Sequence, residues 1–239
     1  MPSRESSVSR LNLYQTPEHD CPYLPDKQAI TQFIDPDKIP TVEIYSYLSS
    51  KGFRRSGEHL YRPACATCKS CISIRLPLDH IALTKSQKRI LKQASLLNFN
   101  HLDAYDSDEH FELYQRYINA RHKGGDMYPA TRELFRGFLL SNWANTQFME
   151  IRDGSQLVAC AVYDRLLNGL SAVYCYFDPD YSHLSPGKLA ILKQMQFAKD
   201  NLIQYLYLGY QIDDCIKMNY KNKYRPVEEF INMQWRRID

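Results

Sequence analysis

YLYLGYQIDDCIKMNYKNKYRP, residues 205–226, combines an apolar strand, a glycine and a basic, tyrosine-rich tail. Tyr205–Leu208 predicts a buried strand, and Gly209 interrupts it where a backbone can approach another group closely. A helix is expected over Ile212–Tyr220, and four cations lie within or just after it: Lys217, Lys221, Lys223 and Arg225. Cations suit phosphates and tyrosine faces suit bases, so the segment favours an anionic, base-containing ligand. A buried strand followed by a solvated basic turn explains the same residues.

Turn residues divide the sequence upstream of this segment into short elements. Three predicted strands, separated by Asp153-Gly154 and Asn168-Gly169 turns that indicate hairpins, are Thr146–Arg152, Gln156–Arg165 and Leu170–Phe177. A helix is predicted from Pro186 to Asn201, with Ser185 as its N-cap. A last strand is expected near Glu229–Trp235. The second half of the chain is therefore predicted to form an α/β (α+β mixed sheet) domain.

This order of strands and helix resembles the acyl-CoA N-acyltransferase (GNAT-like) fold. The resemblance implies two strands that splay apart, with the N-terminus of the helix between them binding the donor's pyrophosphate through free amides and the helix dipole. The corresponding turn here is Leu184–Lys188, in which Pro186 removes one amide donor. This departure counts against coenzyme A and leaves room for another phosphate-bearing donor.

The sequence pattern divides the chain into a smaller cysteine-containing N-terminal domain, residues 1–100, and a GNAT-like C-terminal domain, residues 101–239. The boundary is expected at Asn98–Ser107. Before it, Ile72–Leu78 alternates as a strand does, and a helix over 84–93 has one basic face made of Lys85, Lys88, Arg89 and Lys92. This face suits RNA phosphates or an acidic substrate, although a solvated helix face has the same pattern.

The composition is that of a globular protein with a packed core, since 44% of the 239 residues are hydrophobic and 24% are charged. The net charge of +3 is weak evidence for any partner. No apolar run approaches the ~20 residues of a membrane span, and the polar first residues lack the apolar segment of a secretion signal. We therefore expect a soluble, cytoplasmic protein that binds no membrane.

Three cysteines at two-residue spacing, Cys65, Cys68 and Cys71, form the sharpest local pattern. This spacing lets neighbouring thiolates reach one metal, and Cys21 is a candidate fourth ligand. A tetrahedral zinc site and an iron–sulfur cluster both fit, and so does simple packing of three thiols in a small domain. Cys160 and Cys175 lie in apolar strands and are expected in the core.

A loop after the predicted helix at 108–121 contains His122 and Asp126. The pair could act as a general base with its orienting carboxylate. It could equally form a hydrogen bond that fixes the turn at Gly124-Gly125, and the sequence favours neither interpretation.

Several separate motifs in one order resemble a known family, the aminoacyl-tRNA–protein transferases of the N-degron pathway. They extend from about Cys21 to Pro226 and read Cys21-Pro22-Tyr23-Leu24-Pro25, Gly52-Phe53-Arg54-Arg55-Ser56-Gly57, Tyr61-Arg62-Pro63-Ala64-Cys65, Ser86-Gln87-Lys88-Arg89, Gly125-Asp126-Met127-Tyr128-Pro129, Tyr207-Leu208-Gly209-Tyr210 and Cys215-Ile216-Lys217-Met218-Asn219-Tyr220-Lys221. The short length and the cysteine cluster resemble the bacterial branch. That branch implies transfer of leucine from leucyl-tRNA to the α-amine of proteins that begin with Asp or Glu, which marks them for degradation.

The resemblance also implies roles for particular residues. The aminoacyl ester is already activated, so the transfer is expected to need no cofactor. His122, Asp126 and Tyr210 are candidate catalytic residues, while Lys217, Lys221 and the amides near Gly187 would hold the tRNA end. Tyr207, Tyr210 and Met218 would shape the leucyl and adenine pockets. The acidic first residue of the acceptor needs a cation, for which the candidates are Arg75, Lys85 and Arg89.

Three other functions fit parts of the sequence. An arginyl-tRNA–protein transferase would have the same fold and a different donor. A CoA-dependent N-acetyltransferase would be expected to have an intact glycine-rich turn at 184–189, which this chain lacks. A metal-containing RNA-binding module would bind tRNA and transfer nothing. In each case no DNA partner is expected.

Overall fold

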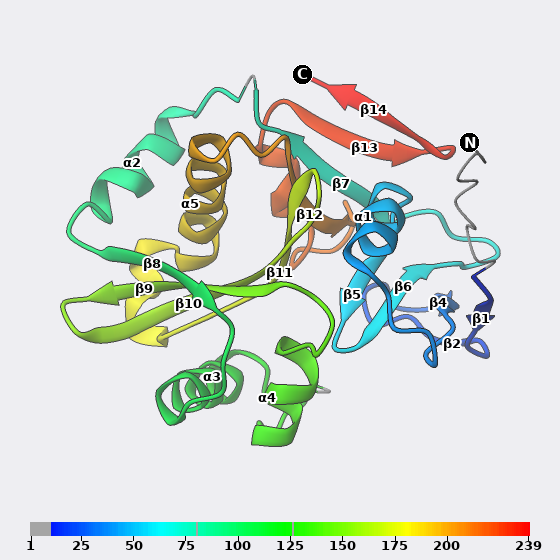
Figure 1. Cartoon of the computed structure of the whole chain (residues 1–239), viewed down its shortest axis with the longest axis horizontal. Helices are drawn as coiled ribbons and strands as arrows, with labels where there is room; N and C mark the ends of the chain where they lie inside the picture. The colour runs from blue at the N-terminus through cyan, green and yellow to red at the C-terminus, as the bar shows by residue number, and fades with distance from the viewer. Residues whose placement is uncertain (1–10, 80, 126) are drawn as a thin grey trace, which may run out of the picture.

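An eight-stranded sheet forms the body of the protein, and a four-stranded sheet lies beside it (Figure 1). The computed structural model describes residues 11–79, 81–125 and 127–239. The strand order in the large sheet is β14-β13-β7-β12-β11-β10-β9-β8. Only β11 and β12 run parallel among these neighbours. The mixed α/β sheet predicted from the sequence is confirmed.

The large sheet draws strands from both halves of the sequence. Its strands are β7 Ile72–Pro77, β8 Asn98–Asp103, β9 Thr146–Asp153, β10 Gln156–Arg165, β11 Gly169–Phe177, β12 Tyr205–Gln211, β13 Val227–Ile231 and β14 Gln234–Ile238. The predicted hairpins β9–β10 and β10–β11 are present as antiparallel pairs. β7 lies between β12 and β13, with Leu76 opposite Leu206. The sheet therefore extends across residue 100, and β8 occupies the stretch where a domain boundary was expected.

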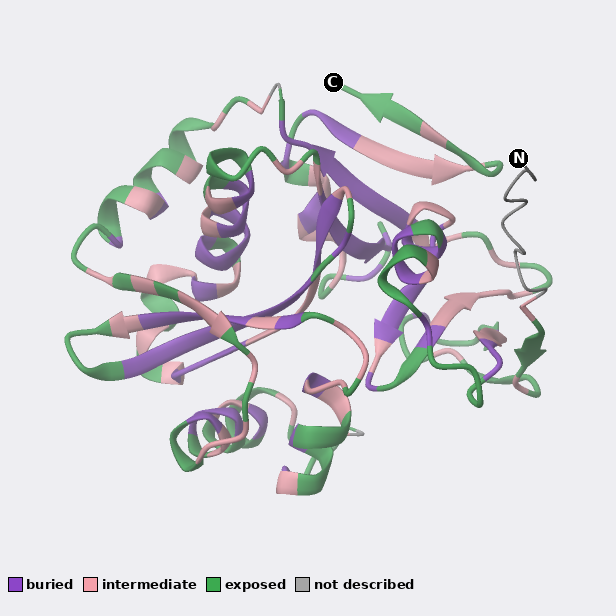
Figure 2. Cartoon of the chain, in the orientation of Figure 1, coloured by how far each residue is buried: buried purple, intermediate pink, exposed green. Residues whose placement is uncertain are grey.

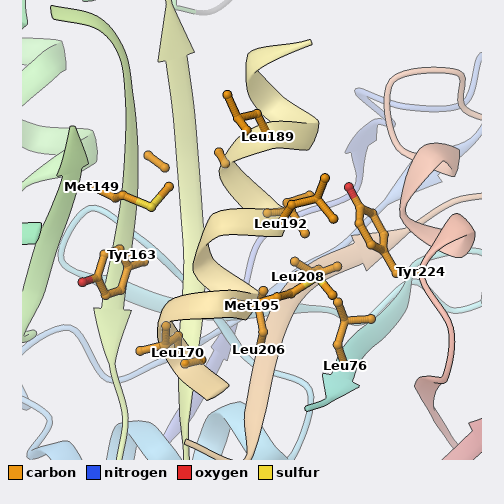
Figure 3. Close-up of a cluster of buried hydrophobic side chains, with 14 of the residues drawn as sticks. Leu76, Met149, Tyr163, Leu170, Leu189, Leu192, Met195, Leu206, Leu208 and Tyr224 are labelled. Carbon is orange, nitrogen blue, oxygen red and sulfur yellow. The ribbon is translucent and has the colours of Figure 1, made fainter. Parts of the chain in front are cut away.

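Helices cover both faces of this sheet (Figures 1 and 2). The helices α2 (Lys85–Gln93) and α5 (Pro186–Asp200) pack on one face, and α3 (Asp108–Arg121) and α4 (Arg132–Leu139) on the other. Alternating residues of β10 supply both cores: Ala161 lies in the core below α5, and Val162 in the core below α3 and α4. Figure 3 shows Leu192 and Met195 of α5 against Leu206 and Leu208 of β12.

The smaller sheet and one helix form an N-terminal module. Its sheet has the order β1-β4-β6-β5, and its elements are β1 Leu13–Gln15, β2 His19–Asp20, β3 Gln28–Ala29, β4 Thr31–Ile34, α1 Val42–Ser50, β5 Arg54–Ser56 and β6 His59–Pro63. A buried polar network, here called the joint, attaches the module to the large sheet. In it Asp164 of β10 accepts hydrogen bonds from Arg55, Tyr45 and Thr146. The Arg55 and Asp164 side chains are 0% exposed.

The strands β11 and β12 separate after three paired positions, the last of which is Ser171 opposite Tyr207. Beyond it β11 continues with β10, and β12 with β7 through an irregularity between Tyr207 and Gly209. Gly209 has φ +82°, a conformation that side chains other than glycine rarely adopt. At Gly169 a Cβ atom would lie 2.8 Å from the Tyr207 ring, so glycine is required where the strands still pair. The splay expected from the resemblance is therefore present.

Three local predictions differ from the structure. Residues 212–220 form successive turns and the start of a 3₁₀ helix, η2 (Asn219–Lys223), in place of the expected α-helix. The turns persist because Ile212 and Cys215 pack with Leu24 of the N-terminal module, a contact that sequence periodicity does not reveal. The expected last strand is a hairpin, β13–β14. Ser185 stands at the start of α5 but makes no side-chain cap there.

Among the described residues, no helix is both long enough and apolar enough to span a membrane.

Candidate active site

A cleft of about 960 Å³ opens where β11 and β12 separate. Its walls are β11, the bulged part of β12, the N-terminus of α5, the C-terminal end of α3 and the N-terminal module. Aromatic rings form much of the lining: Tyr23, Tyr61, Tyr117, Phe138, Tyr174, Phe177, Tyr210 and Tyr220. The cleft therefore offers faces on which planar groups can stack.

The charge of the cleft is one-sided. Six lysine and arginine side chains line it, namely Arg54, Arg55, Arg121, Lys188, Lys217 and Lys221, and the described lining contains no Asp or Glu. Arg55 is neutralised behind the wall by Asp164. Low-dielectric walls strengthen the field of the remaining cations, so the cleft is built to receive anions.

The cations differ in depth. Arg121, Lys188 and Lys217 are exposed, and we call them the rim. Arg54 and Lys221 are 6% and 7% exposed, and we call them the floor. An extended, highly charged ligand can reach the rim without desolvation of its whole backbone, whereas only a small group fits down to the floor.

Lys221 is fixed in the floor by its backbone neighbours. Its Nζ donates a 2.7 Å hydrogen bond to the carbonyl oxygen of Tyr210. Burial lowers the pKa of Lys221 to about 7, with a further contribution from the Arg54 charge. Lys221 lines the cleft beside Met218, and the two residues were predicted to bind the tRNA end and to shape the leucyl and adenine pockets, respectively.

Arg54 takes a position in the gap that the departing β12 leaves. Its Nη2 donates a 2.6 Å hydrogen bond to the carbonyl oxygen of Ala172, one residue beyond the last position of β11 paired with β12. Its Nη1 is buried and finds no hydrogen-bond partner within residues 11–79, 81–125 and 127–239. A Cβ atom at Gly209 would lie 3.5 Å from the Arg54 Nε, which is van der Waals contact, so Gly209 lies directly beside Arg54.

His122 ends α3 and lines the cleft beside Tyr117. Its Nε2 is buried and has no hydrogen-bond partner among the residues that the structure describes. Burial lowers the pKa of His122, and the charges of Lys217 and Arg121 lower it further, so the imidazole is neutral at pH 7 and can accept a proton. Asp126, the predicted orienting carboxylate, lies outside the described residues.

Tyr210 reaches the cleft, but its hydroxyl is engaged elsewhere. It donates to the carbonyl oxygens of Gly52 at 2.8 Å and Tyr61 at 3.3 Å, which holds β12 against the N-terminal module. Burial raises the pKa of Tyr210 well above its ordinary value, so the phenol stays protonated. This geometry gives no support to the predicted catalytic role. Tyr207 is fully buried and does not line the cleft.

The three cations predicted to bind the acceptor carboxylate lie outside the cleft lining. Arg75 is neutralised by Glu228 at 2.6 Å and lies over the ring of Tyr205, 3.7 Å from its centroid. Lys85 and Arg89 are exposed on α2. The basic face of α2 was readable from its spacing, but its distance from the cleft depends on tertiary packing.

The turn that precedes α5 reaches the cleft as predicted. Ser185, Pro186, Gly187 and Lys188 all line it. Gly187 has open space where a side chain would stand, so its backbone is accessible. The amide of Lys188 is already bonded to the carbonyl of Ser185, which leaves fewer free donors here than a glycine-rich turn would supply.

The N-terminal cysteines gather in one place. Cys21, Cys68 and Cys71 pack around Leu24, Ile212 and Cys215. Burial raises the pKa of Cys71 to about 12, and the neighbouring thiols Cys21, Cys65, Cys68 and Cys215 raise it too. Over the described part of the chain, however, no group of three or more His, Cys, Asp or Glu residues is arranged to hold a metal ion. The sulfurs are therefore suitable metal ligands and lie near one another, but they are not arranged to bind one metal ion.

These features together define a class of protein. Its sheet is N-acyltransferase-like, and the aromatic, anion-binding cleft at the splayed strands is suited to group transfer from an anionic donor. The chain belongs to the arginine-tRNA-protein transferase family. The C-terminal region of that family matches residues 109–231, and its N-terminal region matches residues 19–89. The family predicted from the sequence motifs is thus confirmed.

Individual relatives share the same full-length match. The aspartate/glutamate leucyltransferase of Teredinibacter turnerae is 50% identical over 98% of this chain and 97% of its own. That of Hahella chejuensis is 46% identical over 96% and 98% of the two chains. Among solved structures, L-PGS from Bacillus licheniformis has a TM-score of 0.48 at 10% identity, over 61% of this chain and 48% of that one. This structural likeness is too weak to bear on the function.

Sequence reasoning did not single out several residues of the cleft. Arg54, Tyr61, Tyr117, Arg121 and Tyr174 line it although none was a predicted site residue. Arg54 and Tyr61 belonged to motifs that carried the family resemblance, and this was the available signal. Nothing in the sequence alone distinguished Arg54 from Arg55, which also lines the cleft but is neutralised by Asp164 in the joint.

Proposed function

We propose that this chain transfers leucine from leucyl-tRNA to the N-terminal α-amine of proteins that begin with Asp or Glu. The proposal is supported by two relatives whose name is aspartate/glutamate leucyltransferase. The product is a protein marked for the N-degron pathway. The observation that carries the proposal is the cationic cleft at the β11–β12 splay, whose described lining has no carboxylate. Both substrates are anionic at the reacting end, which is what such a cleft selects. We place the reaction in the cytoplasm.

The donor would lie with its terminal phosphates along the rim. Lys188, Lys217 and Arg121 are exposed cations there, and the backbone of Gly187 is open beside them. Tyr117, Tyr174 and Phe177 offer faces for the terminal adenine. Phosphate contacts of this kind position a nucleic acid and do not depend on its base sequence. Contacts with the terminal nucleotides are therefore enough to explain the cleft, without contacts from the rest of the tRNA.

The transfer reaction requires little more than two substrates held in position and one group that accepts a proton. The acceptor α-amine has an ordinary pKa of about 7.7–8.0, so a useful fraction is neutral near pH 7. Its nitrogen forms a bond to the ester carbonyl carbon, and the bond from that carbon to the terminal ribose oxygen breaks. One proton leaves the nitrogen for the neutral His122 Nε2 and is returned to the departing oxygen. Alignment of the two substrates in one cleft supplies much of the rate.

His122→Gln tests this assignment. We expect kcat to fall about 100-fold or more with little change in KM for either substrate, because general-base assistance is lost while the walls of the cleft remain. The acid limb of the wild-type pH profile, set by a His122 pKa below its ordinary value, should also disappear. His183→Gln is the control, since His183 is exposed and does not line the cleft. A large rise in KM for leucyl-tRNA alone would instead place His122 in donor binding.

The donor and acceptor are tested by pairing labelled leucyl-tRNA or arginyl-tRNA with peptides that begin with Asp, Glu or Ala. We expect transfer from leucyl-tRNA to the Asp and Glu peptides only. Transfer from arginyl-tRNA would identify the alternative donor, and acetylation of any peptide by acetyl-CoA would identify a different acyltransferase. Binding of tRNA without transfer would leave a nucleic-acid-binding module and contradict the proposal.

We further propose, as the sequence suggested, that Cys21, Cys65, Cys68 and Cys71 hold zinc or an iron–sulfur cluster. The gathering of these thiols supports it, and a modest rearrangement is needed because no three of them are placed to ligate one ion. No step of the transfer passes through this group. Zinc and iron analysis of protein purified without oxygen should find bound metal. Metal-free protein with native stability and full activity would contradict a resident metal.

A further inference from the structure

We propose that Arg54 is the receptor for the acidic side chain of the acceptor's first residue. This inference rests on the proposed function and adds the determinant of acceptor choice. It assigns a binding role to a residue at the floor of the cleft, whereas Arg75, Lys85 and Arg89, the cations predicted to bind the acceptor carboxylate, do not line it.

The first observation is that the guanidinium of Arg54 has no counter-ion in the described lining. Arg54 is 6% exposed, and among the described residues its buried Nη1 has no hydrogen-bond partner and no Asp or Glu lines the cleft with it. Buried charges in folded proteins are normally paired, and a buried donor without an acceptor destabilises the fold. The Arg54 cation therefore gains a counter-ion and a partner for Nη1 only when an anion binds in the cleft.

The next residue shows what a paired arginine looks like in the same strand. Arg55 gives Nε and Nη2 to the two carboxylate oxygens of Asp164, at 2.6 and 2.9 Å. Both arginines line the cleft, but the Arg55 guanidinium reaches Asp164 in the joint, whereas that of Arg54 has no carboxylate partner among the described residues. The Arg55–Asp164 pair therefore shows, within this protein, how a buried arginine of this strand is neutralised by a carboxylate.

The depth of the floor selects the ligand. A nucleic-acid backbone presents its phosphates along a bulky chain, and the exposed rim cations Arg121, Lys188 and Lys217 are where such a chain can lie. Arg54 lies deeper, among Tyr61, Gly209 and Tyr210. A carboxylate on one short side chain reaches that depth, so the floor fits an Asp or Glu side chain better than a phosphodiester.

The orientation of the guanidinium is fixed before a ligand arrives. The 2.6 Å bond from Nη2 to the Ala172 carbonyl anchors one side of it, which leaves Nη1 as the free donor. Lys221, the second floor cation, adds positive potential nearby. An Asn or Gln first residue matches the shape of Asp or Glu but brings no charge, and the buried cation would then stay unneutralised.

Arg54→Met tests the inference with peptides that begin with Asp, Asn, Glu or Gln. We expect kcat/KM for the Asp and Glu peptides to fall at least ~100-fold, because a charged hydrogen-bond partner is lost. The preference for Asp over Asn should collapse towards one. The Kd for leucyl-tRNA should stay unchanged, which also shows that the variant is folded. Arg54→Lys keeps the charge and should recover part of the Asp preference.

Two variants separate this result from its alternatives. Arg62→Met removes an arginine of the same module that lies over Phe53, bonds to Gln32 and does not line the cleft, and it should leave the Asp preference intact. Lys217→Met should weaken leucyl-tRNA binding without changing the Asp preference. Equal loss of tRNA binding and acceptor use in Arg54→Met would move Arg54 to the donor site. An unchanged Asp preference in that variant would overturn the inference.

A binding measurement distinguishes failure of this inference from failure of the proposed function. Thermal unfolding of the wild-type protein is followed with dipeptides Asp-Ala and Asn-Ala in the absence of tRNA. Asp-Ala should raise Tm more than Asn-Ala in the wild type and equally in Arg54→Met. If the wild type transfers no leucine yet shows this difference, the receptor stands and the transfer proposal fails. If it transfers leucine and Arg54→Met keeps its Asp preference, only the receptor fails.

Discussion

The joint and the floor of the cleft are both buried, polar and built around neighbouring residues of β5, yet they are in opposite electrostatic states. In the joint, Asp164 accepts from Arg55, Tyr45 and Thr146, and the charges cancel. In the floor, Arg54 and Lys221 lie close together, without a carboxylate among the described lining residues. A polar network whose groups are all paired holds two parts of a protein together. A network with unpaired groups can instead gain the missing partners from a bound ligand.

Breaking the joint should have the largest effect on stability. Asp164→Asn leaves the Arg55 guanidinium buried and unneutralised, so we expect the free energy of unfolding to fall by about 3–5 kcal/mol. Urea unfolding followed by circular dichroism measures this loss. Asp180→Asn is the control, because Asp180 pairs with Arg116 at the surface and its side chain is 84% exposed, so its effect should stay within about 0.5 kcal/mol. A similar loss in both variants would show that the joint is not special.

The free energy of unfolding should depend on pH through Lys221 in the floor of the cleft. Lys221 has a pKa of about 7 in the folded protein and its ordinary, higher pKa when unfolded. Between these values the unfolded state binds the extra proton, so this group makes the protein more stable as pH rises. We expect the wild type to gain roughly 2–3 kcal/mol relative to Lys221→Met between pH 7 and pH 9.

The neighbouring Lys223 supplies the control for that measurement, because it lies in the same 3₁₀ helix and is exposed. Lys223→Met should keep the wild-type dependence of urea unfolding on pH. If Lys221→Met also keeps it, Lys221 is protonated in the folded protein at pH 9, and the floor is less desolvated than its burial indicates.

The smallest expected effect has the opposite sign to the first. Arg54→Met removes an unneutralised buried cation and also the bond to Ala172, so we expect the free energy of unfolding to stay level or rise by about 1 kcal/mol. Destabilisation as large as that of Asp164→Asn would show that Arg54 has a structural partner. A gain in stability together with lost acceptor use is the outcome that separates binding from folding.

Local sequence signals predicted much of the fold, and the reason is chemical. Asp153-Gly154 and Asn168-Gly169 specify tight turns almost by themselves, so the meander β9–β10–β11 could be read directly. The segment 212–220 could not, because its turns depend on Leu24, far away in the sequence. The fold class followed from the order of the predicted strands and helix, and the family from several motifs in one order.

The site was less accessible to the same reasoning. Spacing placed Lys85 and Arg89 on one face of a helix, and they are there, but only tertiary packing decides that α2 lies away from the cleft. Arg75 was predicted to be a cation available to the acceptor, but in the folded protein it is paired with Glu228. The difference between Arg54 and Arg55 depends on which side of β5 meets Asp164, and no local pattern contains that information.

The place of β7 in the large sheet has a consequence for how the protein is made. This strand leaves the ribosome early, but its two neighbours, β12 and β13, are among the last segments to be synthesised. The nascent chain must therefore carry an apolar strand without sheet partners during most of its translation, when such edges are prone to aggregate. Completion of the sheet, and of the gap between β11 and β12 in which both substrates would meet, waits for almost the whole polypeptide.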